Sequence, residues 1–179
     1  MRDALPEELP SLRAFALSLT RSSAAADDLV QDTIVKAWTN IDKFETGTNF
    51  RAWLFTIQRN IFYSLLRKRK REVADSDGIH AAALSVRPDH DGRLAYADFV
   101  TAFDQLSPQH REVLVLVGAS GLSYEDAAET LGVAVGTVKS RANRARARLA
   151  ELMHLSEGES VLIHSPAASG DKPAGSGGL

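Results

Sequence analysis

Residues 137–149 constrain the fold more than any other segment of this chain. The segment holds five cations and no acid. On a helix of 3.6 residues per turn, Val138, Ala142, Ala145 and Leu149 fall on one narrow apolar face. We therefore predict a helix that packs by this face and carries its positive charge outward.

The outer face of this predicted helix suits a DNA major groove. Ser140, Asn143 and Arg144 point away from the apolar face, and such polar side chains can reach base edges. The other cations flank them, where they would meet phosphates. A solvated cationic helix surface is the alternative interpretation of such a charge run. The absence of acids and the turn before the segment favour DNA binding.

That preceding turn completes a helix-turn-helix pattern. Ser123 is placed to cap a short helix, with Asp126 in its first turn. Apolar residues at 127, 128 and 131 supply its buried face, and Gly132 suits the end of a helix. The second helix begins near 135–137. This DNA-binding motif consists of a short helix, a tight turn and a second helix with a basic outer face, in that order.

Another helix precedes this pair. Ser107 and Pro108 suit the N-cap and the first helical position, and the helix continues through the apolar residues 113–117. It is expected to end within 118–121. Residues 93–155 are therefore predicted to form a small helical DNA-binding domain.

The first half of the chain also has helical periodicity. The side chains expected to face inward are Leu9, Leu12, Phe15, Ala16 and Leu19, then Val30, Ile34, Ala37 and Trp38, then Trp53, Leu54, Ile57, Ile61 and Leu65. Gly, Thr and Asn predict a loop over 44–50, followed by a long helix over 50–71.

The predicted fold class is all-α, with two small helical domains joined by a flexible linker. Periodicity fails over 74–92, where Asp, Gly, Ser and Pro accumulate. Residues 156–179 carry too little apolar surface to form a core, so we expect a disordered tail.

Charge is sorted along the chain although its formal net charge is only −2. Residues 56–72 hold six cations and one acid, so this segment and 137–149 together carry +10 and the rest carries −12. Two basic patches on an acidic body indicate nucleic-acid contacts at defined places.

Several function classes are disfavoured. The 179 residues include no cysteine, which excludes disulfides, thiolate metal sites and a cysteine nucleophile. The five histidines are scattered without metal-ligand spacing, and there is no Gly-rich phosphate loop or Gly-x-Ser-x-Gly motif. We therefore expect no cofactor and no enzyme activity. The absence of a long apolar run or a signal-peptide core predicts a cytoplasmic protein without membrane contact.

Four segments in order resemble the extracytoplasmic-function (group 4) sigma factors of bacterial RNA polymerase. They are Asp27-Asp28-Leu29-Val30-Gln31-Asp32-Thr33, Phe50-Arg51-Ala52-Trp53-Leu54-Phe55-Thr56-Ile57, Leu106-Ser107-Pro108-Gln109-His110-Arg111-Glu112-Val113-Leu114 and Gly136-Thr137-Val138-Lys139-Ser140-Arg141. The resemblance covers roughly residues 8–153. Within the family the chain is most similar to the EcfG-type general stress factors of alphaproteobacteria, through 60–64 and the basic run 67–71 with the residues after it.

The resemblance implies a sigma-2 domain over 8–73, a linker over 74–92 and a sigma-4 domain over 93–155. It implies binding to core RNA polymerase (its β′ and β subunits), to promoter DNA and to a small NepR-like anti-sigma factor. The implied polymerase-binding residues are Asp28, Leu29, Gln31 and Asp32. Those for the −10 element are Asn60, Tyr63, Arg67, Lys68 and Arg71, with the loop 44–50 walling a flipped-base pocket at Asn60. Those for the −35 element are Thr137, Lys139, Ser140, Arg141, Asn143, Arg144 and Arg148.

Residue chemistry is consistent with these roles. Asp28 and Asp32 lie one helical turn apart beside Gln31, which gives an acidic surface for a basic partner. Asn60, Tyr63 and Arg67 are expected to share one face, where an amide, a ring and a cation could hold an unstacked base and a phosphate. Structural roles, such as packing of the Tyr63 ring, are the alternatives.

Two other functions fit a helical, two-part chain. A sigma mimic would sequester an anti-sigma factor without binding promoters, but mimics of this pathway are fused to a receiver domain, and the 179 residues have no βα pattern for one. A dimeric helix-turn-helix repressor would leave the first half without a purpose. The expected function is transcription initiation at −35/−10 promoters in a general stress response.

Overall fold

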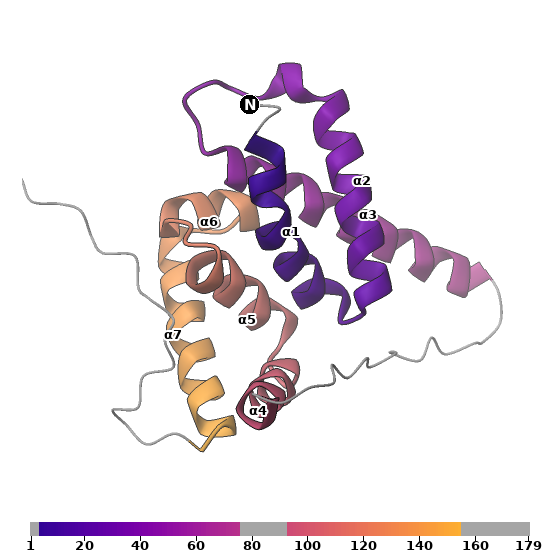
Figure 1. The fold of residues 1–179 in the computed structure, drawn as a ribbon. Helices are drawn as coiled ribbons and strands as arrows, with labels where there is room; N and C mark the ends of the chain where they lie inside the picture. Colours follow the sequence, from indigo (N-terminus) through magenta and orange to yellow (C-terminus); the bar gives the residue numbers. More distant parts are fainter. Residues whose placement is uncertain (1–3, 76–92, 155–179) are drawn as a thin grey trace, which may run out of the picture.

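Helices make up the regular structure of the chain wherever it is described. The computed structural model describes residues 4–75 and 93–154 (Figure 1). The first range contains α1 (Leu5–Thr20), α2 (Ser23–Thr39), the short 3₁₀ helix η2 (Ile41–Lys43) and α3 (Phe50–Asp75). The second contains α4 (Arg93–Asp104), α5 (Pro108–Val113), the π-helical turn η3 (Leu114–Ala119), α6 (Tyr124–Leu131) and α7 (Val135–Leu152). The all-α prediction is confirmed. The expected linker and tail lie outside the described residues, except that α3 continues to Asp75.

The first three helices form one domain around a small aromatic core. α1 and α3 bring Phe15 and Phe55 into edge-to-face contact, with ring centroids 5.0 Å apart, and both rings are fully buried. Ser22 caps α2 by accepting a hydrogen bond from the Ala25 amide at 3.4 Å. On the buried side of α3, Gln58 donates to the Leu12 carbonyl at 3.1 Å, so this core residue is held to α1 by a polar bond.

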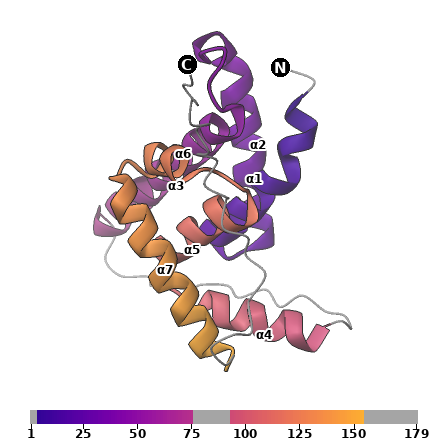
Figure 2. The ribbon, with the colours of Figure 1, turned by 90° about the vertical axis from the view of Figure 1, so that its left-hand side faces the viewer.

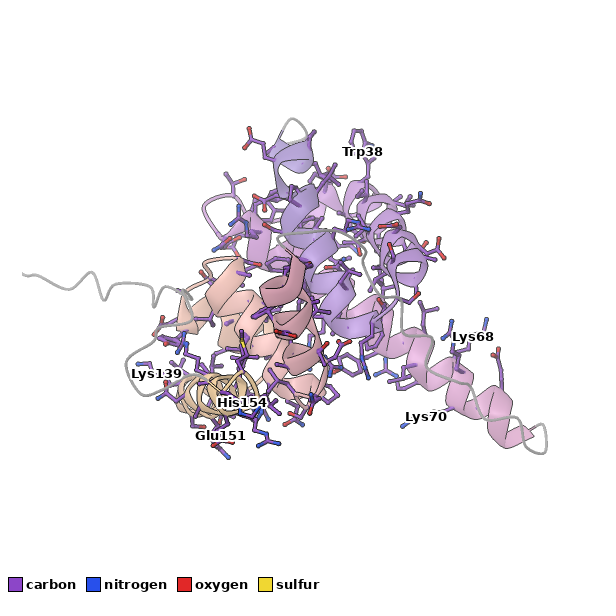
Figure 3. The ribbon with its side chains drawn as sticks, turned by 60° about the horizontal axis from the view of Figure 1, so that its bottom comes forward. Trp38, Lys68, Lys70, Lys139, Glu151 and His154 are labelled. Carbon is purple, nitrogen blue, oxygen red and sulfur yellow. The ribbon has the colours of Figure 1, made fainter. Side chains whose placement is uncertain are left out.

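Most of the side chains expected to face inward are buried or pack against the core, but three are not. Leu9, Trp38 and Leu65 are exposed, at 38%, 48% and 45% respectively. Figure 3 shows Trp38 pointing outward from α2. The face of α2 that is buried carries Ala26, Leu29, Val30, Thr33 and Ala37, and α3 is buried through Ala52, Leu54, Phe55 and Gln58. The reason is that periodicity marks an apolar face but does not show how much of it neighbouring helices cover.

The second domain follows the predicted cap-and-turn pattern. The Ser107 and Ser123 hydroxyls accept from the His110 and Asp126 amides and start α5 and α6. Gly132 adopts φ 66° and ends α6 in the left-handed conformation that glycine allows. The four residues expected to pack α7, Val138, Ala142, Ala145 and Leu149, are all buried. α4 lies across the C-terminal end of α7 (Figure 2).

The two domains pack directly against each other. α1 contacts α5 and η3, and α3 contacts α6, so one continuous apolar cluster includes residues of both halves (Figure 1). Arg111 is 5% exposed and reaches across this interface, donating from Nε to the Ser18 carbonyl at 2.9 Å. Its Nη1 donates to the Leu106 carbonyl at 2.6 Å. The chain therefore adopts a closed arrangement of its domains.

Candidate nucleic-acid interface

The outer face of α7 is open to a ligand, as the sequence predicts. Lys139, Asn143, Arg144 and Arg148 are exposed, and Thr137, Ser140 and Arg141 are half-buried beside them. Arg144 folds back along its own helix, donating from Nε to the Ser140 carbonyl at 3.3 Å and from Nη2 to its hydroxyl at 3.0 Å. Because these bonds are local and exposed, the guanidinium can be released toward a base edge at little cost.

The flanks of this face are partly anchored. The Lys139 ammonium lies 5.6 Å from the centroid of the Tyr124 ring, and Arg148 donates to Glu151 at 2.9 Å. Both residues keep their charge at the surface, where it can meet phosphate. His110, at the start of α5, lies near this face, and no pattern in the sequence indicates that position. Partial burial lowers the pKa of His110, and the charges of Arg144 and Arg141 lower it further.

The acidic surface of α2 is also exposed. Asp28, Gln31 and Asp32 are all accessible. Leu29 is not, and its assignment to the polymerase-binding set needs correction: it is 3% exposed and packs into the core. Leu29 sits between the exposed residues in sequence, but its position on the helix turns it inward, so it supports the surface from below. Val35, which is 64% exposed, extends this surface toward the end of α2 and was not identified from sequence.

Asn60 lies at a hollow between α2 and α3. The hollow has a volume of about 640 Å³ and is lined by side chains of both helices, including Asp32, Lys36, Trp53, Ile57 and Asn60. The Asn60 side chain is exposed there. Its amide therefore stands beside an aromatic ring and apolar side chains, the combination that holds an unstacked base.

Tyr63 does not border the hollow that contains Asn60, although the two residues were expected to act together on one face of α3. Its hydroxyl is hydrogen-bonded to the Glu112 carboxylate of α5, and the Arg59 guanidinium lies 4.7 Å from its ring centroid. Burial, together with the hydrogen bond and the charge of Glu112, raises the pKa of Tyr63 to about 12, although the charges of Arg59 and Arg111 act in the opposite direction. The two positions are only about 60° apart around the helix axis, but Tyr63 bonds to α5 whereas Asn60 borders the hollow between α2 and α3.

The basic end of α3 projects from the body of the protein. Figure 3 shows Lys68 and Lys70 on the part of α3 that extends away from the other helices. Arg67 and Arg71 are exposed on the same segment, and Lys68 lies 3.8 Å from Glu72. An exposed, positively charged helix end of this kind is suited to phosphate contacts rather than to reading base edges.

The loop before α3 borders a second hollow rather than the one that contains Asn60. Phe44, Phe50 and Trp53 anchor the loop by ring contacts, with centroids 5.3–5.9 Å apart. Loop residues Thr48 and Asn49 then face Asp126 and Glu129 of α6 across a hollow of about 750 Å³. The Asn49 amide donates to Asp126 Oδ2 at 2.8 Å. Lys43 and Trp53 line both hollows, so the two hollows are adjacent.

Comparison with known proteins identifies the class. Residues 7–72 match the family described as Sigma-70 region 2, and residues 96–149 match Sigma-70, region 4. The ECF RNA polymerase sigma factor EcfG of Rhodopseudomonas palustris is 52% identical over 159 residues, covering 89% of this chain and 88% of that protein. The sigma factor CnrH of Cupriavidus metallidurans is 38% identical, covering 71% and 72%.

A solved structure extends this likeness to three dimensions. The sigma factor RpoE of Bartonella quintana, in complex with the anti-sigma factor NepR, has 52% sequence identity and a TM-score of 0.76, covering 87% of this chain and 99% of that one. The chain belongs to the extracytoplasmic-function sigma factors, the RNA polymerase subunits that direct transcription initiation to promoters. In the part of the chain that the structure describes, no helix is long and apolar enough to cross a membrane.

Proposed function

We propose that this sigma factor reads the −35 element through α7 and opens the −10 element through α3, with domains bounded at 8–73 and 93–155. The observation that carries the proposal is the outer face of α7. Its polar and cationic side chains, with Asn143 and Arg144 exposed, lie directly opposite a fully buried apolar face. A helix fixed in this way can enter a major groove without losing its packing.

The exposed residues Asp28, Gln31 and Asp32 serve core polymerase binding. Two carboxylates and an amide on one side of α2 offer acceptors to a basic partner surface. The exposed Val35 adds an apolar contact at the same edge, since interfaces combine polar contacts with a desolvated apolar centre.

The −10 element is read at the hollow between α2 and α3. Asn60 supplies the donor and acceptor for a base edge, and Trp53 at the same hollow supplies an aromatic wall. Arg67, Lys68 and Arg71 guide the phosphate backbone along α3. Tyr63 is a candidate stacking residue once its bond to Glu112 is broken.

A small NepR-like anti-sigma factor controls the protein, within a general stress response in the cytoplasm. The support is the likeness to an RpoE in complex with NepR and to an EcfG factor. The protein acts as an initiation factor and not as an enzyme.

The test is run-off transcription with purified core polymerase on candidate −35/−10 promoters. We expect a product only when the chain is added, and a NepR-type protein should suppress it. A chain that binds the inhibitor but gives no product on any promoter would be a sequestering mimic.

A further inference from the structure

One stripe of α3 is covered by the sigma-4 domain. Ala52, Thr56, Arg59 and Tyr63 follow each other at helical spacing, and each contacts α5 or α6. At the start of the stripe, the Thr130 hydroxyl of α6 donates to the Ala52 carbonyl at 3.4 Å. The domains are therefore held together along the same helix that carries Asn60 beside this stripe, at the hollow between α2 and α3.

The stripe ends in a buried carboxylate. Glu112 is 2% exposed, and it accepts from Arg59 Nε at 3.2 Å and from the Tyr63 hydroxyl. A carboxylate taken out of water is stable only when it is paired and hydrogen-bonded, and these two donors of the sigma-2 domain meet that need. While they donate to Glu112, the Arg59 guanidinium Nε and the Tyr63 hydroxyl are not available to another acceptor.

A second carboxylate acts at the loop that precedes α3. Asp126 accepts from the Asn49 amide at 2.8 Å, and Glu129 lines the same hollow together with Lys43. Carboxylate oxygens thus face the loop and the first turn of α3 from the sigma-4 side. While Asp126 holds the Asn49 amide, a phosphate oxygen of DNA cannot accept from it, and the two carboxylates would repel a phosphate brought to this hollow.

The closed arrangement is too short to act on a whole promoter. By their numbering, the −35 and −10 elements lie about 25 base pairs apart, or roughly 85 Å at 3.4 Å per base pair. A compact chain of this length has a radius of gyration of about 16 Å. The two domains must therefore separate before both elements can be bound.

We propose that Glu112 and Asp126 form an intramolecular latch, in which carboxylates of the sigma-4 domain bind hydrogen-bond donors of α3 and of the loop before it and hold the free chain closed. The inference rests on the proposed promoter-binding function. The likeness to RpoE in its NepR complex supports it, because a TM-score of 0.76 over 87% of the chain requires both domains to superpose. The closed form is thus one that an inhibited relative also adopts.

A cleavable crosslink tests whether closure blocks function. The chain has no native cysteine, so cysteines introduced at Arg21 and Asp104 can be joined selectively. These side chains pair across the domains at 3.4 Å, outside the proposed DNA and polymerase surfaces. We expect a chain joined there by a disulfide-containing bismaleimide to give no run-off product, and reduction to restore the product. Single-cysteine chains treated with the same reagent are the controls.

Substitutions test whether the two carboxylates are the latch. Asp126→Ala and Glu125→Ala remove the same charge from the same helical turn, but only Asp126 bonds to the loop. We expect Asp126→Ala to bind a single-stranded −10 oligonucleotide about fivefold more tightly than Glu125→Ala. The reason is that a larger fraction of the Asp126→Ala chain is open and able to bind the oligonucleotide. Binding of a −35 duplex should be equal. Glu112→Gln, which keeps the side-chain size, should also bind the −10 strand more tightly than wild type.

Two results would overturn the latch, and a different result would refute the proposed promoter-binding function. A crosslinked chain that transcribes as well as the reduced chain overturns the latch, as does equal −10 binding by Asp126→Ala and Glu125→Ala. If Glu112→Gln unfolds, the surface variant Asp126→Ala still decides. A wild-type chain without run-off product would instead refute the proposed function.

Discussion

Arg144 is the residue through which the −35 assignment can be tested most cleanly. Its bonds in the free protein run to Ser140 within its own helix, and its side chain is exposed. Replacing it with alanine should therefore leave the unfolding transition nearly unchanged. A well-formed contact between arginine and a base is worth about 1–3 kcal/mol, so Arg144→Ala should weaken binding of the −35 duplex by roughly 5- to 150-fold.

Arg148→Ala is the matched control. Arg148 is a cation on the same helix, but it lies on the flank and pairs with Glu151. Its loss should weaken binding by a similar factor on specific and unrelated duplexes, and should lower the slope of log K against log salt by about 1. Arg144→Ala should reduce the discrimination between the two duplexes. Fluorescence anisotropy across a salt series measures both quantities. Unchanged discrimination after Arg144→Ala would show that α7 is docked by another face.

Three further changes probe other parts of the account. Asp32→Lys should abolish most core polymerase binding in a pull-down while leaving thermal unfolding nearly intact, since Asp32 is exposed; a normal pull-down would remove it from the interface. Leu29→Ala should cost about 2–5 kcal/mol in denaturant unfolding because Leu29 is a core residue; an unchanged midpoint would contradict its burial role. Arg144→Ala should raise the pKa of His110 in an NMR titration, because a repelling cation is removed; an unmoved pKa would place the two groups apart.

In the sigma-4 domain, the helix-turn-helix and the helix before it could be predicted from sequence, whereas α4 and the π-helical geometry of η3 could not. Its helix starts are marked by Ser107 and Ser123, and its turn by Gly132, all local signals that the backbone obeys. The apolar face of α7 was also predicted residue by residue. The reason is that α7 is apolar on one side only, so the helical period of 3.6 residues identifies its buried face without ambiguity.

The sigma-2 helices were harder to orient. On α3, Leu54 and Phe55 are fully buried, Ile57 and Ile61 are partly buried where they border the hollow that contains Asn60, and Leu65 is exposed. Hydrophobic periodicity marks an apolar face, but it does not show how much of that face neighbouring helices cover. Trp38 of α2 was misplaced for the same reason.

Contacts between the domains had no signal in the sequence. Arg59 and Glu112 are separated by 53 positions, and nothing local distinguishes their pairing from that of any other cation and acid. Tyr63 was expected to face DNA, but its hydroxyl bonds to Glu112. Such contacts depend on how two finished domains dock, which only the tertiary structure specifies.

The central claim is that this chain opens promoters, with Asn60 reading an unstacked base of the −10 element. Permanganate footprinting of the complex with core polymerase tests it most directly. The account predicts reactive −10 thymines with the wild-type chain, and roughly tenfold weaker reactivity with Asn60→Ala, the effect of losing about 1–3 kcal/mol of base contact. A pre-melted mismatch at the flipped position should partly restore the variant. Equal footprints for wild type and Asn60→Ala on the matched promoter would contradict the assignment, and unreactive thymines with both would contradict the claim itself.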